Sequence, residues 1–420
     1  MAVVEPLRAL RYDHAVAGPA QNLVAPPYDV VDPDARARLA ARSPFNVVHV
    51  DLPGGRDPYG DAGRRFAEWR RAGAVVQDAE PALWPVAQEF TAPDGRRRIR
   101  RGFLARVRLE DYGPGRIRAH ERTHPAPRED RLRLTRALAA NLSPVFSLFS
   151  DPDGAVRTAL APHTEGPPVA EAHDDKGTTH RLWRVTDDAP LSAVREALAD
   201  AELLIADGHH RYETARAYAE EVGGEGPHRF VLMLLVALED EGLLVLPTHR
   251  LVAGTTPAQQ EALARTLHAH FDVADVAFDE LAPPPGDGPP QLGFVDAHFQ
   301  RPFRLTLADQ AAADAALAGM PEPFRHLDAA VLEALVLKGP LELTDDDIAH
   351  LRRLGYARTA EEAVALVREG TFDVAFLLRP PRIEQVRAAA ATGVSLPPKS
   401  TFFHPKVPSG LLFHALRGPD

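Results

Sequence analysis

The sequence predicts an α/β protein (α+β, with mixed sheets). Short apolar runs alternate along its 420 residues with amphipathic segments of helical period, which is typical of strands and covering helices. The clearest case is the apolar run Leu203–Ala206, which is followed by an Asp207-Gly208 turn and by a helical segment, Tyr212–Val222. An Asp94-Gly95 pair between two further strand candidates predicts a hairpin.

The length suggests two or three domains, and we divide the chain into three regions. These are an N-terminal α/β region at 1–110, a core at 111–250 and a C-terminal α/β region at 251–420. In the first region we expect helices at 34–41 and 60–72 and strands at 46–52, 82–90 and 99–109.

The same patterns predict the elements of the other two regions. In the core we expect strands at 145–149, 180–185, 203–206 and 230–238 and helices at 130–140, 191–200 and 212–222. In the C-terminal region we expect helices at 257–270, 328–337 and 360–370, strands at 273–278 and 373–378, and a Pro- and Gly-rich loop at 282–290.

The composition restricts the class of protein. The formal net charge of −11 disfavours binding to nucleic acid, and the lack of cysteine excludes disulfides, thiolate metal sites and cysteine nucleophiles. The longest apolar run, Phe230–Leu238, is too short to span a bilayer. The first residues lack a basic segment followed by an apolar one, so we expect no signal peptide and a cytoplasmic protein.

Candidate chemistry concentrates in five consecutive residues, Asp207-Gly208-His209-His210-Arg211. They lie between a buried strand and a helix, so they occupy a helix N-terminus, where free backbone N–H groups favour a phosphate. Arg211 adds a forked donor for phosphate oxygens, and the two histidines add titratable donors. Asp207 could hold a metal ion or a proton. The alternative is a polar turn in which Asp207 caps the helix.

Two further polar segments precede this turn. In His120-Glu121-Arg122-Thr123, Glu121 could act as a general base or help to hold a divalent ion, and the alternative is a charged surface turn. In Ala25-Pro26-Pro27-Tyr28-Asp29, two prolines fix an extended backbone. They present Tyr28 and Asp29 rigidly, either to a substrate or within a structural turn.

The C-terminal tail contains Lys399-Ser400-Thr401 and Lys406. Lysine and hydroxyl side chains together can contact phosphate oxygens, although the Gly-rich run of a P-loop is missing. The alternative is an extended arm whose phenylalanines, Phe402 and Phe403, pack against the body of the protein. The two interpretations are compatible, because the phenylalanines can pack while the lysines face a ligand. Structural zinc lacks support because adjacent His209 and His210 would point in different directions. A Ser-His-Asp hydrolase lacks support because no Gly-x-Ser-x-Gly elbow occurs.

Four motifs follow one another along the chain. They are Ala25-Pro26-Pro27-Tyr28-Asp29-Val30, His120-Glu121-x-Thr123, Asp207-Gly208-His209-His210-Arg211-Tyr212-Glu213-Thr214-Ala215 and Pro398-Lys399-Ser400-Thr401-x-Phe403-x-Pro405-Lys406. In this order they resemble the DUF1015 family of uncharacterised bacterial and archaeal proteins. The resemblance covers nearly the whole chain and by itself implies no reaction.

Residues 118–220 also resemble the core of the ParB/sulfiredoxin-like superfamily, in particular its free serine kinases, which carry Asp-Gly-His-His-Arg and an upstream His-Glu. This resemblance implies that Glu121 is the base on a serine hydroxyl. It implies that Asp207 is a second catalytic carboxylate or a magnesium ligand, and that Gly208, His209, His210 and Arg211 surround the phosphates. Sulfiredoxin chemistry itself is excluded, because it needs a cysteine in this turn.

We therefore expect a phosphotransferase that uses magnesium and a nucleotide, ATP or ADP, and acts on free serine, phosphoserine or a similar small hydroxy metabolite. The full set of candidate site residues comprises catalytic Glu121, Asp207, His209 and His210, phosphate-binding Gly208, Arg211, His120, Thr123, Lys399, Ser400 and Lys406, substrate-binding Tyr28 and Asp29, and Asp207 as metal ligand.

Two alternatives stay open. One is a nucleotide-binding regulator of the CTPase type, although residues 251–420 contain no basic recognition helix. The other is a different enzyme that acts on a phosphorylated metabolite, with histidines doing the acid–base work. We expect no membrane partner, and the oligomeric state is open, with a homodimer as one option.

Overall fold

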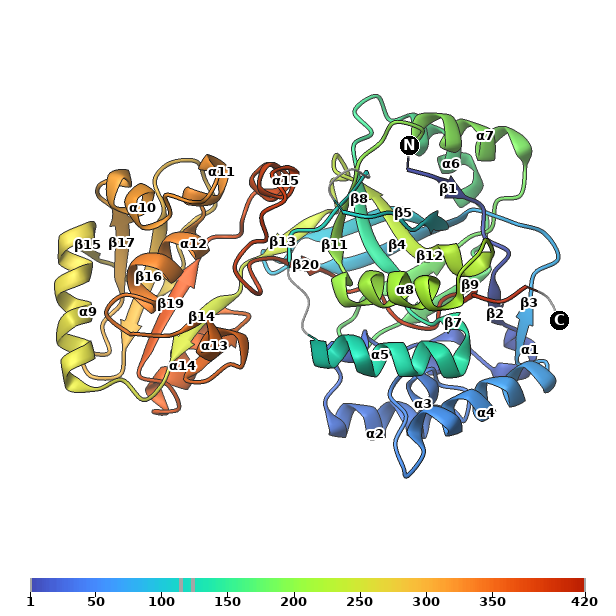
Figure 1. The fold of residues 1–420 in the computed structure, drawn as a ribbon, viewed down its shortest axis with the longest axis horizontal. Coiled ribbons are helices and arrows are strands. Elements are labelled where there is room, and N and C mark those ends of the chain that lie inside the picture. The colour runs from blue at the N-terminus through green and yellow to red at the C-terminus, as the bar shows by residue number, and fades with distance from the viewer. Residues whose placement is uncertain (1, 113–115, 122–124, 419–420) are drawn as a thin grey trace. The chain divides into compact units, whose positions relative to one another are not determined.

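The computed structural model describes residues 2–112, 116–121 and 125–418, except for the side chains of 125–127 (Figure 1). The chain divides into two compact units. Unit 1 comprises Met1–Ala119, Thr123–Leu243 and Pro405–Asp420, and unit 2 comprises His120–Arg122 and Leu244–His404. The predicted α/β class with mixed sheets is confirmed.

A nine-stranded mixed sheet forms the centre of unit 1, in the order β6-β11-β8-β12-β5-β4-β10-β9, with β1 paired to β5. Its strands are β1 (Val4–Glu5), β4 (Trp84–Thr91), β5 (Arg97–Arg108), β6 (Ile117–Arg118), β8 (Val145–Phe149), β9 (Ala170–His173), β10 (Thr179–Leu182), β11 (Leu203–Asp207) and β12 (Phe230–Ala237). β11 is parallel to β6 and antiparallel to β8, and β8 is parallel to β12. The middle strands are apolar runs because both faces of the sheet are covered there.

Helices cover this sheet, and the core is formed where they meet it. They are α5 (Pro125–Leu138), α6 (Ala155–Leu160), η3 (Ala161–Thr164), α7 (Asp188–Ala197), α8 (His209–Val222) and η4 (Pro227–Arg229). Ile205 and Met233 of the sheet belong to one buried cluster with Val194 of α7 and Tyr212 of α8. In Figure 1, α5 runs beside α8, against which it packs.

The N-terminal part of unit 1 is a helical layer with its own apolar cluster, to which Phe66, Trp69 and Phe413 belong. Its elements are α1 (His14–Ala17), η1 (Ala20–Asn22), η2 (Tyr28–Val30), α2 (Pro33–Arg42), α3 (Val48–Asp51), α4 (Pro58–Arg71) and the paired strands β2 (Leu10–Tyr12) and β3 (Val75–Gln77). A second small pair joins β7 (Ala140–Asn141) to β21 (His414–Ala415).

The predicted strand at 46–52 is wrong, because the chain forms the short helix α3 there. The buried Asn46 side chain explains the difference. Its Oδ1 accepts a hydrogen bond from Val48 N at 3.0 Å, and its Nδ2 donates to the carbonyl oxygens of Asn22 and Val24. This local bonding favours a turn over an extended backbone.

Unit 2 contains a six-stranded antiparallel sheet in the order β15-β17-β16-β19-β14-β18. Its strands are β14 (His249–Val252), β15 (Phe271–Asp275), β16 (Gln291–Asp296), β17 (Phe303–Leu307), β18 (Leu354–Ala357) and β19 (Val374–Leu378), and a separate pair joins β13 (Leu244–Leu246) to β20 (Phe402–His404). The helical elements are α9 (Pro257–His270), η5 (Phe278–Glu280), α10 (Gln310–Ala316), α11 (Glu322–Arg325), α12 (Asp328–Leu332), η6 (Glu333–Leu337, a π-helix), α13 (Asp345–Ala349), α14 (Ala360–Arg368) and α15 (Ile383–Ala391).

Most elements predicted from periodicity are confirmed within a few residues, and α9 and β8 have the predicted bounds. Within the described residues, no helix combines the length and the apolar composition that crossing a bilayer requires.

Candidate functional site

The predicted turn at 207–211 is built as a sharp passage from strand to helix. β11 ends at Asp207, Gly208 caps the helix with φ of 95°, and α8 begins at His209. This left-handed backbone favours glycine. A Cβ at Gly208 would also lie 2.9 Å from Nε and Cζ of Arg211, so glycine leaves the room that the guanidinium occupies.

Asp207 is the centre of a charged cluster. Its Oδ1 accepts a hydrogen bond from Nζ of Lys406, and its Oδ2 accepts one from Nη2 of Arg211. The three side chains are only 12–18% exposed. Burial alone would raise the pKa of Asp207, but the charges of Lys406 and Arg211 outweigh it and hold this pKa well below its ordinary value. Asp207 is therefore a carboxylate at neutral pH.

Two buried polar side chains hold Lys406 at this place. Nη2 of Arg100 donates to the carbonyl oxygen of Pro405 at 2.6 Å, and Nε2 of Gln88 donates to the carbonyl oxygen of Lys406 at 3.2 Å. Arg100 also donates to Oε1 of Gln88, and its guanidinium lies 4.5 Å from the ring centre of Phe146. Burial lowers the pKa of Arg100 to about 9.

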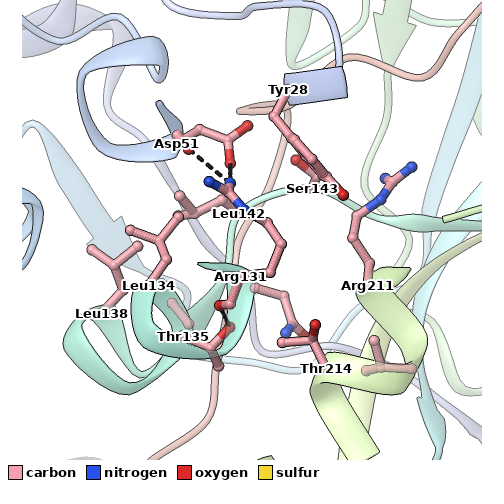
Figure 2. A pocket seen from close by; sticks show the side chains of 13 residues that line it. Tyr28, Asp51, Arg131, Leu134, Thr135, Leu138, Leu142, Ser143, Arg211 and Thr214 are labelled. Atoms are coloured by element: carbon pink, nitrogen blue, oxygen red, sulfur yellow. Dashed lines mark hydrogen bonds and ion pairs between the residues drawn. The ribbon is translucent and has the colours of Figure 1, made fainter. Parts of the chain in front are cut away.

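A small pocket lies beside Arg211 (Figure 2). It is lined by Tyr28, Asp51, Arg131, Leu134, Thr135, Leu138, Ala140, Asn141, Leu142, Ser143, Arg211, Thr214 and Val231. Its volume of about 50 Å³ is enough for a few water molecules or a group of similar size. Figure 2 shows Tyr28 reaching toward the pocket between Arg131 and Arg211.

The walls of this pocket are fixed by an ion pair. Nη1 of Arg131 donates to Oδ1 of Asp51 at 3.1 Å and to its carbonyl oxygen at 2.8 Å, and Oγ of Ser409 donates to Oδ2 of Asp51 at 2.9 Å. The Arg131 guanidinium lies 4.4 Å from the ring centre of Tyr28. Burial raises the pKa of Tyr28 to about 12, so its hydroxyl stays protonated. The buried hydroxyl of Thr214 has no hydrogen-bond partner among the described residues.

The structure thus brings together candidates that are far apart in the sequence. Tyr28, Asp207, Arg211 and Lys406 meet in unit 1. Asp29 is exposed and does not line the pocket, although its charge contributes to the raised pKa of Tyr28. His209 is buried and His210 is half-buried, and the catalytic roles predicted for them stay predictions.

The remaining described candidates belong to unit 2. Nε2 of His120 lies 2.9 Å from Oγ1 of Thr401, and Oγ of Ser400 donates to the carbonyl oxygen of Pro397 at 2.6 Å. The charge of Glu121 acts on the buried Arg250, and Lys399 is exposed. Thr123 lies outside the described residues. The roles predicted for this group stay predictions.

Sequence patterns missed the residues that support the cluster, namely Arg100, Gln88, Asp51, Arg131 and Ser409. Arginine is frequent in this chain, so nothing marks Arg100 or Arg131 as buried. Asp51 was missed because the sequence pattern predicted a strand at 46–52, where the chain forms α3. Proximity to the motifs could have drawn attention to Ser409, which follows Lys406 by three residues.

Within the described part of the chain, no three His, Asp or Glu side chains gather as a group that could hold a metal ion. Asp207, the predicted metal ligand, instead faces two cationic side chains. Its role as a ligand stays a prediction.

Several solved structures are similar to this chain at low sequence identity. A comparison with solved structures finds a conserved hypothetical protein from Pyrococcus furiosus at 16% identity, with a TM-score of 0.34, covering 70% of this chain and 90% of that one. It also finds a mutant free serine kinase in complex with ADP, at 13% identity and a TM-score of 0.36, covering 73% and 87%. A third is C-terminally truncated SbnI from Staphylococcus aureus, at 12% identity and a TM-score of 0.38, covering 74% and 87%.

The comparison with curated proteins gives no match. A family model described as "Protein of unknown function (DUF1015)" matches residues 4–330, which is more than three quarters of the sequence. This confirms the family resemblance; the matched range includes the first three motifs, whereas the fourth, at 398–406, lies beyond it. The chain belongs to the DUF1015 family.

Proposed function

We propose that this protein is a phosphotransferase that moves a phosphoryl group between a nucleotide, ATP or ADP, and a small hydroxy metabolite, with free serine or phosphoserine as the first candidates. One observation carries the proposal. Three segments far apart in the sequence bring Arg211, Lys406 and Tyr28 to the N-terminus of α8, next to a small pocket. The resemblance of residues 207–211 to the turn of free serine kinases supports a phosphotransferase as well. We include in the proposal that the core of the protein is ParB/sulfiredoxin-like.

Arg211, Lys406 and the positive N-terminal end of α8 are suited to hold phosphate oxygens. The low pKa of Asp207 makes it a weak general base, which argues for a positioning role. Its two oxygens hold one cation each, so the cations are oriented before a phosphate arrives. Such preorganised charge is commonly the largest contribution to catalysis of phosphoryl transfer.

The chemical step needs a base for the hydroxyl proton, and we assign it to Glu121 on the strength of the resemblance. The hydroxyl oxygen attacks phosphorus, the bond between phosphorus and the bridging oxygen of the nucleotide breaks, and the proton passes to Glu121. Transfer from phosphoserine to ADP is the reverse of these events. Magnesium would enter with the nucleotide and neutralise phosphate charge.

The pocket beside Arg211 is the candidate place for the small hydroxy metabolite. Its walls offer the Tyr28 hydroxyl, the Arg131–Asp51 ion pair and the unsatisfied Thr214 hydroxyl. These groups can bind both charges of an amino acid, the carboxylate by arginine and the ammonium by aspartate. The small volume favours a compact acceptor over a sugar or a peptide.

The test is phosphorus NMR on the full chain with magnesium. ATP, ADP and CTP are each incubated with serine, and phosphoserine is incubated with and without ADP. We expect phosphoserine to appear or disappear, and Arg211→Ala to lower the rate by about a hundredfold or more. Arg216→Ala is the matched control, because Arg216 lies on the same helix but pairs with Glu213 and Asp111.

Each outcome is decisive. If folded wild-type protein converts none of the mixtures, the proposal is wrong. Nucleotide binding without turnover would favour a regulator, and turnover that Arg211→Ala and Arg216→Ala reduce equally would remove the site from the turn at 207–211.

A further inference from the structure

Unit 2 contains a cavity that the proposed function does not use. It lies between α9 and the strands β15, β16 and β17, and its volume is about 430 Å³. Its walls are mainly apolar, with Leu263 and Leu267 on α9 and Phe294, Phe303 and Leu305 on the sheet. Volume and lining are typical of pockets that bind small organic molecules.

An exposed aromatic side chain marks this cavity. Phe299 is among the residues that line it, and 67% of Phe299 is open to solvent. The neighbouring His298 ring packs edge to face against it, with 4.6 Å between the ring centres. A ligand in the cavity would gain hydrophobic contact by covering this ring.

Two aspartates, Asp296 and Asp373, line the same cavity. Asp296 ends β16 and pairs in register with Val374, the first residue of β19, and Asp373 directly precedes that strand. Oδ1 of Asp296 accepts hydrogen bonds from N of His298 and of Phe299 at 2.8 and 2.7 Å. Oδ2 of Asp373 accepts from N and Oγ1 of Thr255 at 2.6 and 2.9 Å.

In the part of the chain that the structure describes, neither of these two aspartates forms an ion pair with a lysine or an arginine. Arg301 stacks 5.6 Å from the ring centre of Phe303, but its charge is paired with Asp275 at 2.5 Å. Two negative charges beside an aromatic wall attract a positive charge, which aromatic faces also favour.

We propose that the cavity under α9 is a binding site for a small organic cation, a molecule with a planar apolar body and an ammonium group. The body would lie between α9 and the Phe294–Phe303 wall under Phe299. The ammonium group would lie at Asp296 and Asp373. The site is separate from the charged cluster at Asp207 and does not depend on the proposed function.

The test measures binding to the full chain by calorimetry, without nucleotide. Three probes share one indole body: tryptamine is cationic, 3-methylindole is neutral and indole-3-acetate is anionic. We expect tryptamine to bind best. Asp296→Asn keeps the acceptor for the two N–H groups and removes the charge, so it should weaken tryptamine by about three- to fivefold and leave 3-methylindole unchanged.

A pair of tryptophan variants tests the location. Ala264 lines the cavity at an exposed position of α9, so Ala264→Trp should block it and weaken tryptamine by about tenfold or more. Ala269→Trp adds the same side chain to an exposed position of the same helix outside the cavity, and should change binding less than about twofold. Absence of tryptamine binding, tighter binding of indole-3-acetate, or equal effects of the two tryptophan variants would each overturn the proposal.

Discussion

The pairing of Lys406 with Asp207 gives the most direct test of the site. In Lys406→Met the side chain keeps most of its apolar length and loses only the charge. Asp207, which is 16% exposed, would then keep its ion pair with Arg211. Loss of one partner of a buried ion pair costs about 3–5 kcal/mol, and because Arg211 stays, we expect about 2 kcal/mol of unfolding free energy to be lost.

The assay is urea denaturation of the full chain, followed by circular dichroism, for wild type, Lys406→Met, Asp207→Asn and the double variant. When Asp207 is neutral, Lys406 has no carboxylate to stabilise. Lys406→Met should then cost less than about 1 kcal/mol, which gives a coupling energy of about 1–2 kcal/mol. Lys399→Met is the control, because Lys399 is exposed and its replacement should change stability by less than about 0.5 kcal/mol. Additive effects of the two substitutions would refute the reasoning.

Three more predictions concern the backbone and the titrating groups. Gly208→Ala should cost about 2 kcal/mol of unfolding free energy, because its Cβ would meet Arg211 at 2.9 Å. Gly73→Ala, at φ of 74° with nothing within 4 Å, carries backbone strain alone and should cost about 1 kcal/mol in the same denaturation assay; equal losses would contradict the contact. Because the pKa of Asp207 is depressed in the folded protein, the unfolded chain binds the proton first as the pH falls. The difference in unfolding free energy between wild type and Asp207→Asn should therefore be full above about pH 4 and decrease as the pH falls toward the folded pKa. A difference that is constant from pH 6 to pH 3 would argue against a buried, paired carboxylate. Burial lowers the pKa of His249 from 6.5 to about 4, so the unfolded chain binds the proton first in this window. The loss of unfolding free energy between pH 6.5 and 4 should therefore be about 3 kcal/mol larger in wild type than in His249→Gln, which still contains the buried His414 with its similarly lowered pKa. Urea denaturation of both proteins at each pH measures this difference, and equal losses would contradict it.

Local patterns in the sequence were enough to predict the elements that carry the site. The apolar run before Asp207, the Asp-Gly turn and the helical period after it predicted β11 and α8 closely. They also placed Arg211 at the N-terminus of this helix, although the predicted helix began at Tyr212 and α8 begins three residues earlier, at His209. The prediction of a strand at 46–52 was wrong, because hydrogen bonds of the buried Asn46 side chain favour a turn there although the local pattern of residues is typical of a strand.

The contacts that give the site its charge were decided by tertiary structure. Lys406 lies 199 residues after Asp207, and its place depends on hydrogen bonds from Gln88 and Arg100 on two other strands. The sequence by itself therefore determined the family, the strand–turn–helix at 207–211 and the types of residue available for binding phosphate. Only the fold decided which arginines are buried and which lysine of the tail neutralises Asp207, because periodicity records which face of an element is apolar but not which distant element packs against it.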